Sequence, residues 1–196
     1  MTPIDKFNDN ILSIKNYSQL RSYICKNTPL IDSCEILRMQ LSLAVGSLDK
    51  YIHDKLIFYF TNKIKRNDVF GNNFIKFTVL EVLEIAFETD SDIRKQLLLN
   101  RIVNKINKIT FQSPDSVQKA AKTMEITDFW GRLSSIMNMD SAILQGKLKL
   151  IVERRNKIVH ESDFDDIAMT KRPISENDVQ SSIVFIETFI SAFDTL

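Results

Sequence analysis

The pattern that most constrains this chain is a helical period, which is strongest between residues 143 and 159. Apolar side chains recur there at intervals of three and four, the spacing that places them on one face of an α-helix. These side chains are Ile143, Leu144, Leu148, Ile151, Val152, Ile158 and Val159. The chain has no sustained alternation of strand length, and only four glycines and four prolines interrupt its 196 residues. The sequence therefore predicts an all-α fold, a helical bundle with short loops.

One predicted helix is much longer than the others and would form the centre of the bundle. It runs from about Pro29, since proline is favoured in a first helical turn, to about Lys65. Before it, Pro3–Lys26 is expected to form one or two short helices. We divide the chain accordingly into an N-terminal helical extension, residues 1–30, and a helical domain, residues 31–196.

Charge is distributed unevenly along the chain. Residues 1–160 contain 24 Lys and Arg against 17 Asp and Glu, whereas residues 161–196 contain 2 against 8. The segment with the strongest helical period is locally basic, which suits a polyanion such as RNA, although a solvated helix face has the same composition. The candidate RNA-binding residues are Lys147, Lys149, Arg154 and Lys157, and Arg154 is expected to point to solvent.

Cysteine usage and hydropathy bear on metals and on location. Cys25 and Cys34 have no metal-ligand spacing relative to either histidine, so we expect free thiols and no metal or other cofactor. Met1–Leu20 has no apolar core of the kind found in signal peptides, and no apolar stretch is long enough to cross a bilayer. These features predict a cytoplasmic protein without membrane contact.

Only two histidines occur in the chain, and His160 follows a pair of arginines near the end of the strongest helical period. Arg155 interrupts the apolar stripe, while Asn156 and His160 stack on adjacent turns. A guanidinium at the border of a buried face is costly unless it is paired or meets a partner surface. The alternatives to a functional site are a salt bridge from Arg155 to Asp49, Asp54 or another acid of the long helix, and a helix-capping or plain surface role for His160.

Three stretches of the sequence resemble a known family. They are residues 47–53 (SLDKYIH), 151–163 (IVERRNKIVHESD) and 172–174 (RPI). Together they resemble the HEPN superfamily, and within it the RiboL-PSP-HEPN branch, over roughly Ile31–Leu196. The run from Arg155 to His160 matches the R-x4-6-H signature of the superfamily, in which a polar residue usually follows the arginine.

The resemblance implies an all-α HEPN-type bundle that forms a homodimer in which two motif helices face one another. Many active members of the superfamily are metal-independent endoribonucleases of phage-defence or toxin–antitoxin systems. Carried over to this chain, His160 is the catalytic histidine, Arg155 the motif arginine and Asn156 the polar residue beside it. Asp49 and His53 match a polar pair of the branch and are candidates for support of the site, although His53 also fits a simple bridge between helices.

These side chains have the chemistry that RNA cleavage requires. RNA carries its own nucleophile, the 2′-hydroxyl, so cleavage needs a base, an acid and a cation at the phosphate. His160 can exchange protons near neutral pH, and Arg155 can bind two phosphate oxygens. Because each chain has one motif histidine, a symmetric dimer would supply the second. The expected products are a 2′,3′-cyclic phosphate and a 5′-hydroxyl.

Two other functions fit the same sequence. One is a non-catalytic HEPN module that dimerises or recruits RNA or a protein, which RNA binding without cleavage would favour. The other is an inhibitory or structural subunit whose acidic segment, Glu161–Asp178, masks a basic cleft, so that neutralising this segment would change RNA affinity. The expected partners are a second copy of the chain, an RNA (tRNA, mRNA or rRNA) and an antitoxin or defence-system protein.

Overall fold

The computed structural model describes residues 1–28, 30–66, 68, 71–85 and 88–196, and 76% of the residues are helical. The elements in chain order are α1 (Pro3–Asn27), α2 (Cys34–Arg66), α3 (Asn72–Glu84), α4 (Ser91–Ile106), α5 (Pro114–Thr123), α6 (Phe129–Met137), α7 (Ser141–His160), β1 (Phe164–Asp165), β2 (Thr170–Lys171) and α8 (Glu176–Asp194). The prediction of an all-α bundle with a long central helix is confirmed, since α2 alone has 33 residues.

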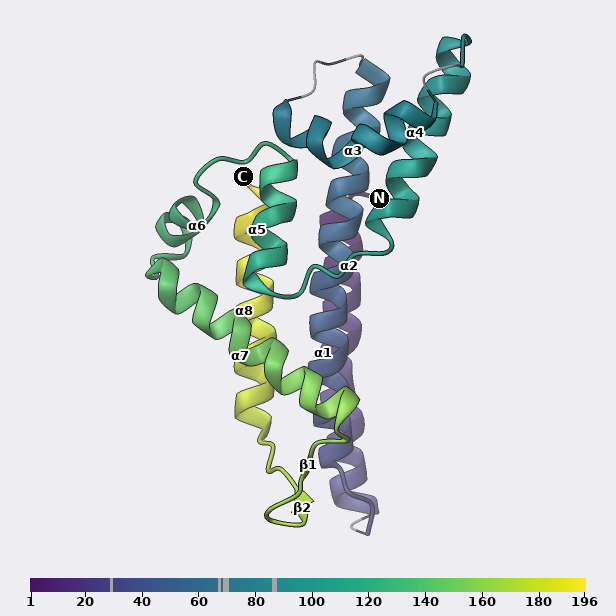
Figure 1. The fold of residues 1–196 in the computed structure, drawn as a ribbon. Coiled ribbons are helices and arrows are strands. Elements are labelled where there is room, and N and C mark those ends of the chain that lie inside the picture. Colours follow the sequence, from purple (N-terminus) through teal and green to yellow (C-terminus); the bar gives the residue numbers. More distant parts are fainter. Residues whose placement is uncertain (29, 67, 69–70, 86–87) are drawn as a thin grey trace.

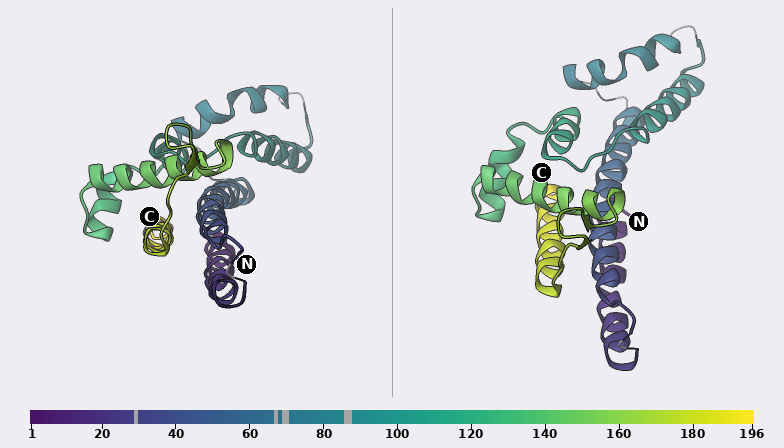
Figure 2. Two further views of the ribbon diagram at one scale, coloured as in Figure 1. Left: turned by 90° about the horizontal axis from the view of Figure 1, so that it is seen from below. Right: turned by 60° about the horizontal axis from the view of Figure 1, so that its bottom comes forward.

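Three long helices, α1, α2 and α8, run side by side and form the main body of the molecule (Figure 1). α1 and α2 form an antiparallel pair, and α8 packs against both of them. α7 crosses one face of this body obliquely, which is clearest in the two views of Figure 2. A short hairpin, in which β1 pairs antiparallel with β2, then connects α7 to α8.

The hydrophobic core lies between these long helices, and α1 contributes to it. Phe7 of α1 is buried against Tyr51 of α2, with ring centroids 5.8 Å apart, and Tyr51 contacts Phe193 of α8 at 6.0 Å. Full burial of such a side chain contributes roughly 1.5–3 kcal/mol, so contacts of this kind hold α1 on the body. The division of the chain at residue 30 stays a prediction, but α1 shares its core with the rest of the chain.

Three details of the helix boundaries differ from the prediction or lie beyond it. α1 is one helix of 25 residues rather than one or two short ones, because Thr2 and Asp5 cap its start reciprocally and its apolar side packs along α2. The acidic segment after α7 contains the β1–β2 hairpin. Pro29, the predicted start of the long helix, lies outside the described residues, and α2 begins at Cys34.

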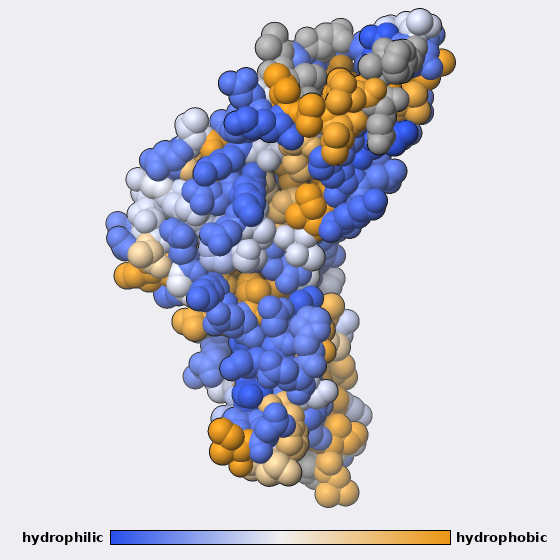
Figure 3. Space-filling model, viewed as in Figure 1, coloured by the Kyte–Doolittle hydropathy of each residue, from blue (hydrophilic) through white to orange (hydrophobic). Residues whose placement is uncertain are grey.

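α3 leaves much of its apolar side chain surface exposed. It packs against α4 and α5, and Figure 3 shows the apolar patch that it forms near one end of the molecule. The exposed large apolar residues of this helix are Ile75, Val79, Leu80, Val82 and Leu83. None of the described helices, α3 included, is long and apolar enough to cross a membrane.

Candidate functional site

The last turns of α7 carry the three motif residues. α7 starts at Ser141, where the Asp140 carboxylate accepts hydrogen bonds from the backbone N–H groups of two residues in the first turn. It ends at His160, the last residue before the chain turns into the hairpin. Arg155 and Asn156 are partly buried where α7 crosses the body, whereas His160 is exposed at the helix end.

The guanidinium of Arg155 is held by neutral groups only. Its Nη1 donates to Asn156 Oδ1 at 3.1 Å and to Gln112 Oε1 at 3.4 Å, and its buried Nε has no hydrogen-bond partner among the described residues. The predicted alternative, a direct salt bridge to α2, is wrong for both acids. Asp54 pairs with two lysines, and Asp49 reaches Arg155 only through Gln112.

Gln112 connects the motif arginine to α2, and the sequence analysis missed it. Its Nε2 donates to Asp49 Oδ2 at 3.1 Å, while the backbone N–H of Phe111 donates to Asp49 Oδ1 at 2.6 Å. Asp49 thus fixes the segment between α4 and α5. The hydrogen bond from Arg155 to Gln112 in turn fixes the guanidinium relative to that segment. Gln112 lies outside any helix and 43 residues before Arg155 in sequence, so no spacing rule points to it.

His53 anchors the same segment from α2. Its Nδ1 lies 2.8 Å from the backbone oxygen of Asp49, and its Nε2 lies 2.8 Å from the backbone oxygen of Ile109. The ring packs edge-on against Phe111, with centroids 5.0 Å apart. Both ring nitrogens of His53 face backbone oxygens, and whichever nitrogen carries the proton donates to one of them, so this histidine is placed to position the segment.

Arg154 does not point to solvent, which corrects the prediction. Its Nη1 lies 2.6 Å from Asp163 Oδ1 and its Nη2 lies 2.8 Å from Asp163 Oδ2, while Arg38 Nε donates to Asp163 Oδ2 at 2.7 Å. Asp163 is 0% exposed, and a carboxylate so buried needs such pairing. The chain reverses after α7 with Asp163 in the left-handed region, at φ 57°, and helix periodicity cannot foresee that return.

The other candidate RNA-binding residues are exposed along α7. Lys147, Lys149 and Lys157 all reach solvent, and Lys149 lies 3.8 Å from Glu153. Asn156 lines a groove of about 430 Å³ between α7 and the start of α5. The structure thus brings Arg155, Asn156, Gln112 and Asp49 into one connected cluster at the end of this groove, and places His160 one turn beyond Asn156.

A family model described as RiboL-PSP-HEPN matches residues 5–196. The chain belongs to the RiboL-PSP-HEPN family. No curated protein and no solved structure matches it. HEPN domains commonly bind RNA and dimerise, so membership supports the general assignment of a nuclease or RNA-binding module. Within the described part of the chain, no group of three or more His, Cys, Asp or Glu side chains is arranged to hold a metal ion.

The acidic segment of this RiboL-PSP-HEPN protein pairs with arginines of its own framework. Besides the buried Asp163, Glu161 and Asp165 both face Arg172, at 3.4 Å and 3.7 Å. Hydrogen bonds from the backbone N–H groups of the hairpin turn hold the pKa of Asp165 below its usual range. In the described structure, these carboxylates therefore stabilise the hairpin, and Asp165 is also near enough to Lys157 of α7 for that charge to help lower its pKa.

Proposed function

We propose that this RiboL-PSP-HEPN protein is a metal-independent endoribonuclease that cleaves RNA by attack of a 2′-hydroxyl on the adjacent phosphate. The observation that supports this best is the charge of Arg155, which has no acidic partner among the described residues and is held there by the amide oxygens of Gln112 and Asn156. A phosphate of RNA supplies the missing anion, and the guanidinium stabilises the charge that grows on its oxygens.

Proton transfer is assigned to His160. Its side chain is exposed, and no hydrogen bond or ion pair ties it to another of the described residues. Asn156 uses its Oδ1 to accept from Arg155, which leaves its Nδ2 to donate to a phosphate or ribose oxygen one turn before His160. The three side chains can thus serve as phosphate cation, orienting amide and proton carrier.

A homodimer completes this proposal, because one chain has a single motif histidine. On α7, the side chain of Ile143 is 53% exposed and that of Leu150 is 66% exposed. A spacing of seven residues places these two side chains on the same helix face. Gly146 lies between them, and a Cβ on it would meet nothing within 4 Å, so another helix can approach closely. A two-fold axis that runs along this face would pack two copies of α7 in parallel, and the two copies of His160 would then lie at the same end of the interface.

The biological setting proposed for this activity is a bacterial defence or toxin–antitoxin system in the cytoplasm. The substrate class is tRNA, mRNA or rRNA, and an antitoxin or defence-system protein is the proposed regulatory partner. A second candidate function is a non-catalytic HEPN module that binds RNA or protein. It is favoured by one observation: within one chain, no described residue orients the His160 ring.

The test is cleavage of total RNA and tRNA by the purified chain in excess EDTA. We expect products with 2′,3′-cyclic phosphate ends, and loss of cleavage in Arg155→Ala and in His160→Ala. The matched control is Arg132→Ala, an arginine of α6 that lies away from the end of α7 (Figure 1). If the native chain cleaves nothing while its RNA binding survives His160→Ala, the non-catalytic module replaces the nuclease. Cleavage that survives both motif substitutions contradicts the assignment of this site.

The shared site has its own test, in which native chain is mixed with an equal amount of His160→Ala and the subunits are allowed to exchange. If two His160 side chains act together, only native homodimers are active and about a quarter of the activity at the same total concentration remains. About half of the activity remains if each protomer works alone, and that result would contradict the shared site.

A further inference from the structure

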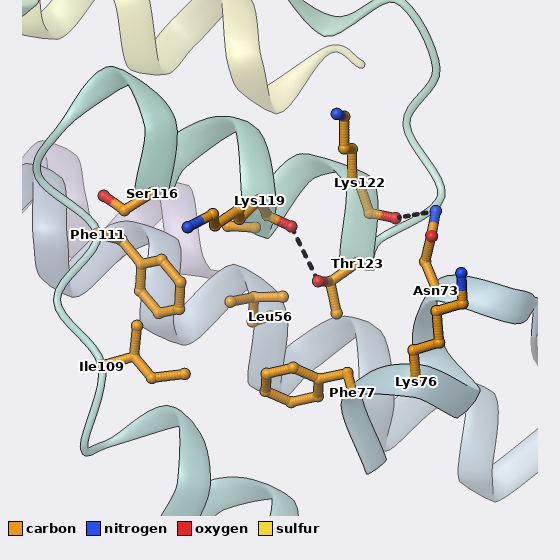
Figure 4. A pocket seen from close by; sticks show the side chains of 11 residues that line it. Leu56, Asn73, Lys76, Phe77, Ile109, Phe111, Ser116, Lys119, Lys122 and Thr123 are labelled. Atoms are coloured by element: carbon orange, nitrogen blue, oxygen red, sulfur yellow. Dashed lines mark hydrogen bonds between the residues drawn. The ribbon is translucent and has the colours of Figure 1, made fainter. Parts of the chain in front are cut away.

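A second cavity, of about 370 Å³, lies beside the segment that carries Gln112. Figure 4 shows its apolar wall, where the side chains of Leu56, Phe77, Ile109 and Phe111 come together from α2, α3 and the segment between α4 and α5. Pockets of this size and composition hold small ligands, which are oriented by a few polar groups at the rim. The function proposed above does not use this cavity.

The rim of the cavity is basic. Lys76, Lys119 and Lys122 line it, all three are exposed, and no Asp or Glu is among the described lining residues. Figure 4 shows the Lys119 side chain extended toward Phe111, with its ammonium group beside the apolar wall. The acid three residues after Lys122, Glu125, bonds elsewhere, and the hydrogen bond from a lysine of α2 lowers its pKa.

An apolar wall with two aromatic residues, and lysines that have no acidic partner among the described residues, together fit a nucleotide. Nucleobases stack on aromatic side chains in sites that bind single strands, while lysines meet the phosphates. Asn73 adds an acceptor at the rim, since its Nδ2 donates to the backbone oxygen of Lys122 at 3.2 Å and its Oδ1 has no partner among the described residues. A fatty acid would use the apolar wall and a single cation, and would leave the other cations and this acceptor unsatisfied.

The cavity is also adjacent to the proposed cleavage site. Phe111 lines the cavity, and the next residue, Gln112, bonds Arg155. One short segment of irregular backbone thus carries both a residue of the cavity wall and the residue that bonds the motif arginine. A strand of RNA whose phosphate lies at Arg155 therefore passes close to the mouth of the cavity.

We propose that this cavity binds one unpaired nucleotide of the RNA, with its base against the apolar wall and its phosphate at the lysine rim. The inference rests on the proposed function, since it makes the substrate of that site single-stranded near the cut. A base in a duplex cannot enter without leaving its stack, so duplex RNA is excluded.

The direct test is methyl NMR of the full chain labelled at isoleucine δ1 groups, titrated separately with 5′-AMP, inorganic phosphate and octanoate. Ile109 lines the cavity, and Ile183, fully buried in α8, is the internal control. We expect AMP alone to shift Ile109 and to leave Ile183 unchanged. Lys119→Glu should weaken AMP binding by about tenfold or more, whereas Lys26→Glu, an exposed lysine at the end of α1, should not.

Three outcomes overturn the proposal: no shift of Ile109 at millimolar AMP, an equal shift with phosphate alone, or a shift with octanoate but not with AMP. The titration also separates this inference from the nuclease assignment. If RNA is cleaved but AMP does not shift the Ile109 methyl signal, the nuclease assignment stands and the nucleotide-pocket proposal is wrong. If AMP specifically shifts the Ile109 signal but no RNA is cleaved, the nucleotide-pocket proposal is supported and the nuclease assignment is wrong.

Discussion

Two neighbouring arginines of α7 have opposite surroundings. Arg154 faces the β1–β2 hairpin, where it shares the buried carboxylate of Asp163 with Arg38. Arg155 faces the segment between α4 and α5, where its partners are the neutral amides of Gln112 and Asn156. One residue along a helix turns a side chain by about 100°, and this rotation is enough to separate the two environments.

The difference shows that, at this end of α7, one arginine stabilises the fold while its neighbour is available to bind a ligand. The charge of Arg154 is neutralised inside the fold, so it fixes the hairpin and with it the end of α7. The charge of Arg155 is held in place by groups that do not neutralise it, so it remains available to an anion. Asn156 and Gln112 supply position, while Asp163 supplies both position and countercharge.

The largest effect is expected from Asp163→Asn. Asparagine fits the backbone, because it tolerates the left-handed conformation, but it leaves Arg38 and Arg154 without their buried countercharge. Loss of one partner from a buried ion pair costs about 3–5 kcal/mol, which we expect in the free energy of unfolding measured with urea. Asp165→Asn is the control, since its carboxylate pairs at the surface, and we expect it to lower the free energy of unfolding much less than Asp163→Asn does. Equal losses of unfolding free energy in both variants would show that Asp163 does not stabilise the arrangement of Arg38 and Arg154.

The next effect separates the two arginines by activity. Arg155→Gln keeps much of the length of the side chain and removes its charge, so we expect kcat/KM for RNA cleavage to fall by about 10²–10³-fold. Arg154→Gln should lower the melting temperature instead, and below that temperature should change kcat/KM by less than about tenfold. Thermal denaturation and initial cleavage rates, measured on the same preparations, test the expected loss of stability and the expected loss of activity. A reversed pattern would place the phosphate at Arg154.

Helical periodicity accounts for most of the fold, and short-range spacing accounts for the motif. The stripe of α7 and the Asp140 cap were readable because side chains three and four residues apart share a helix face. Gln112 and Asp163 were not, since both lie in irregular backbone and act on residues brought close by the tertiary fold. For the same reason the predicted orientation of Arg154 was wrong, because the position of its side chain depends on a chain reversal that the local sequence pattern does not encode.

A smaller effect is expected from Gln112→Leu, which removes the link between Asp49 and Arg155 at nearly constant volume. We expect kcat to fall by about tenfold because the guanidinium is less well oriented, with a smaller change in KM. The split distinguishes positioning from a general loss of fold, which would lower the active fraction and the unfolding free energy together. Gln118→Leu, on the partly exposed side of α5, is the matched control. If the two variants behave alike, Gln112 has no part in the site.

The smallest effect concerns salt. Each phosphate contact releases counterions, and for single strands the slope of log Kd against log salt changes by about 0.7 per contact. In a His160→Ala background, which prevents cleavage, Arg155→Gln should reduce the slope for a single-stranded RNA by about this amount. Arg154→Gln should change the slope less, because the guanidinium of Arg154 is bonded to the buried carboxylate of Asp163, which it shares with Arg38. Equal slopes for both variants would mean that the RNA backbone meets neither arginine, and the distinction between them would then be structural only.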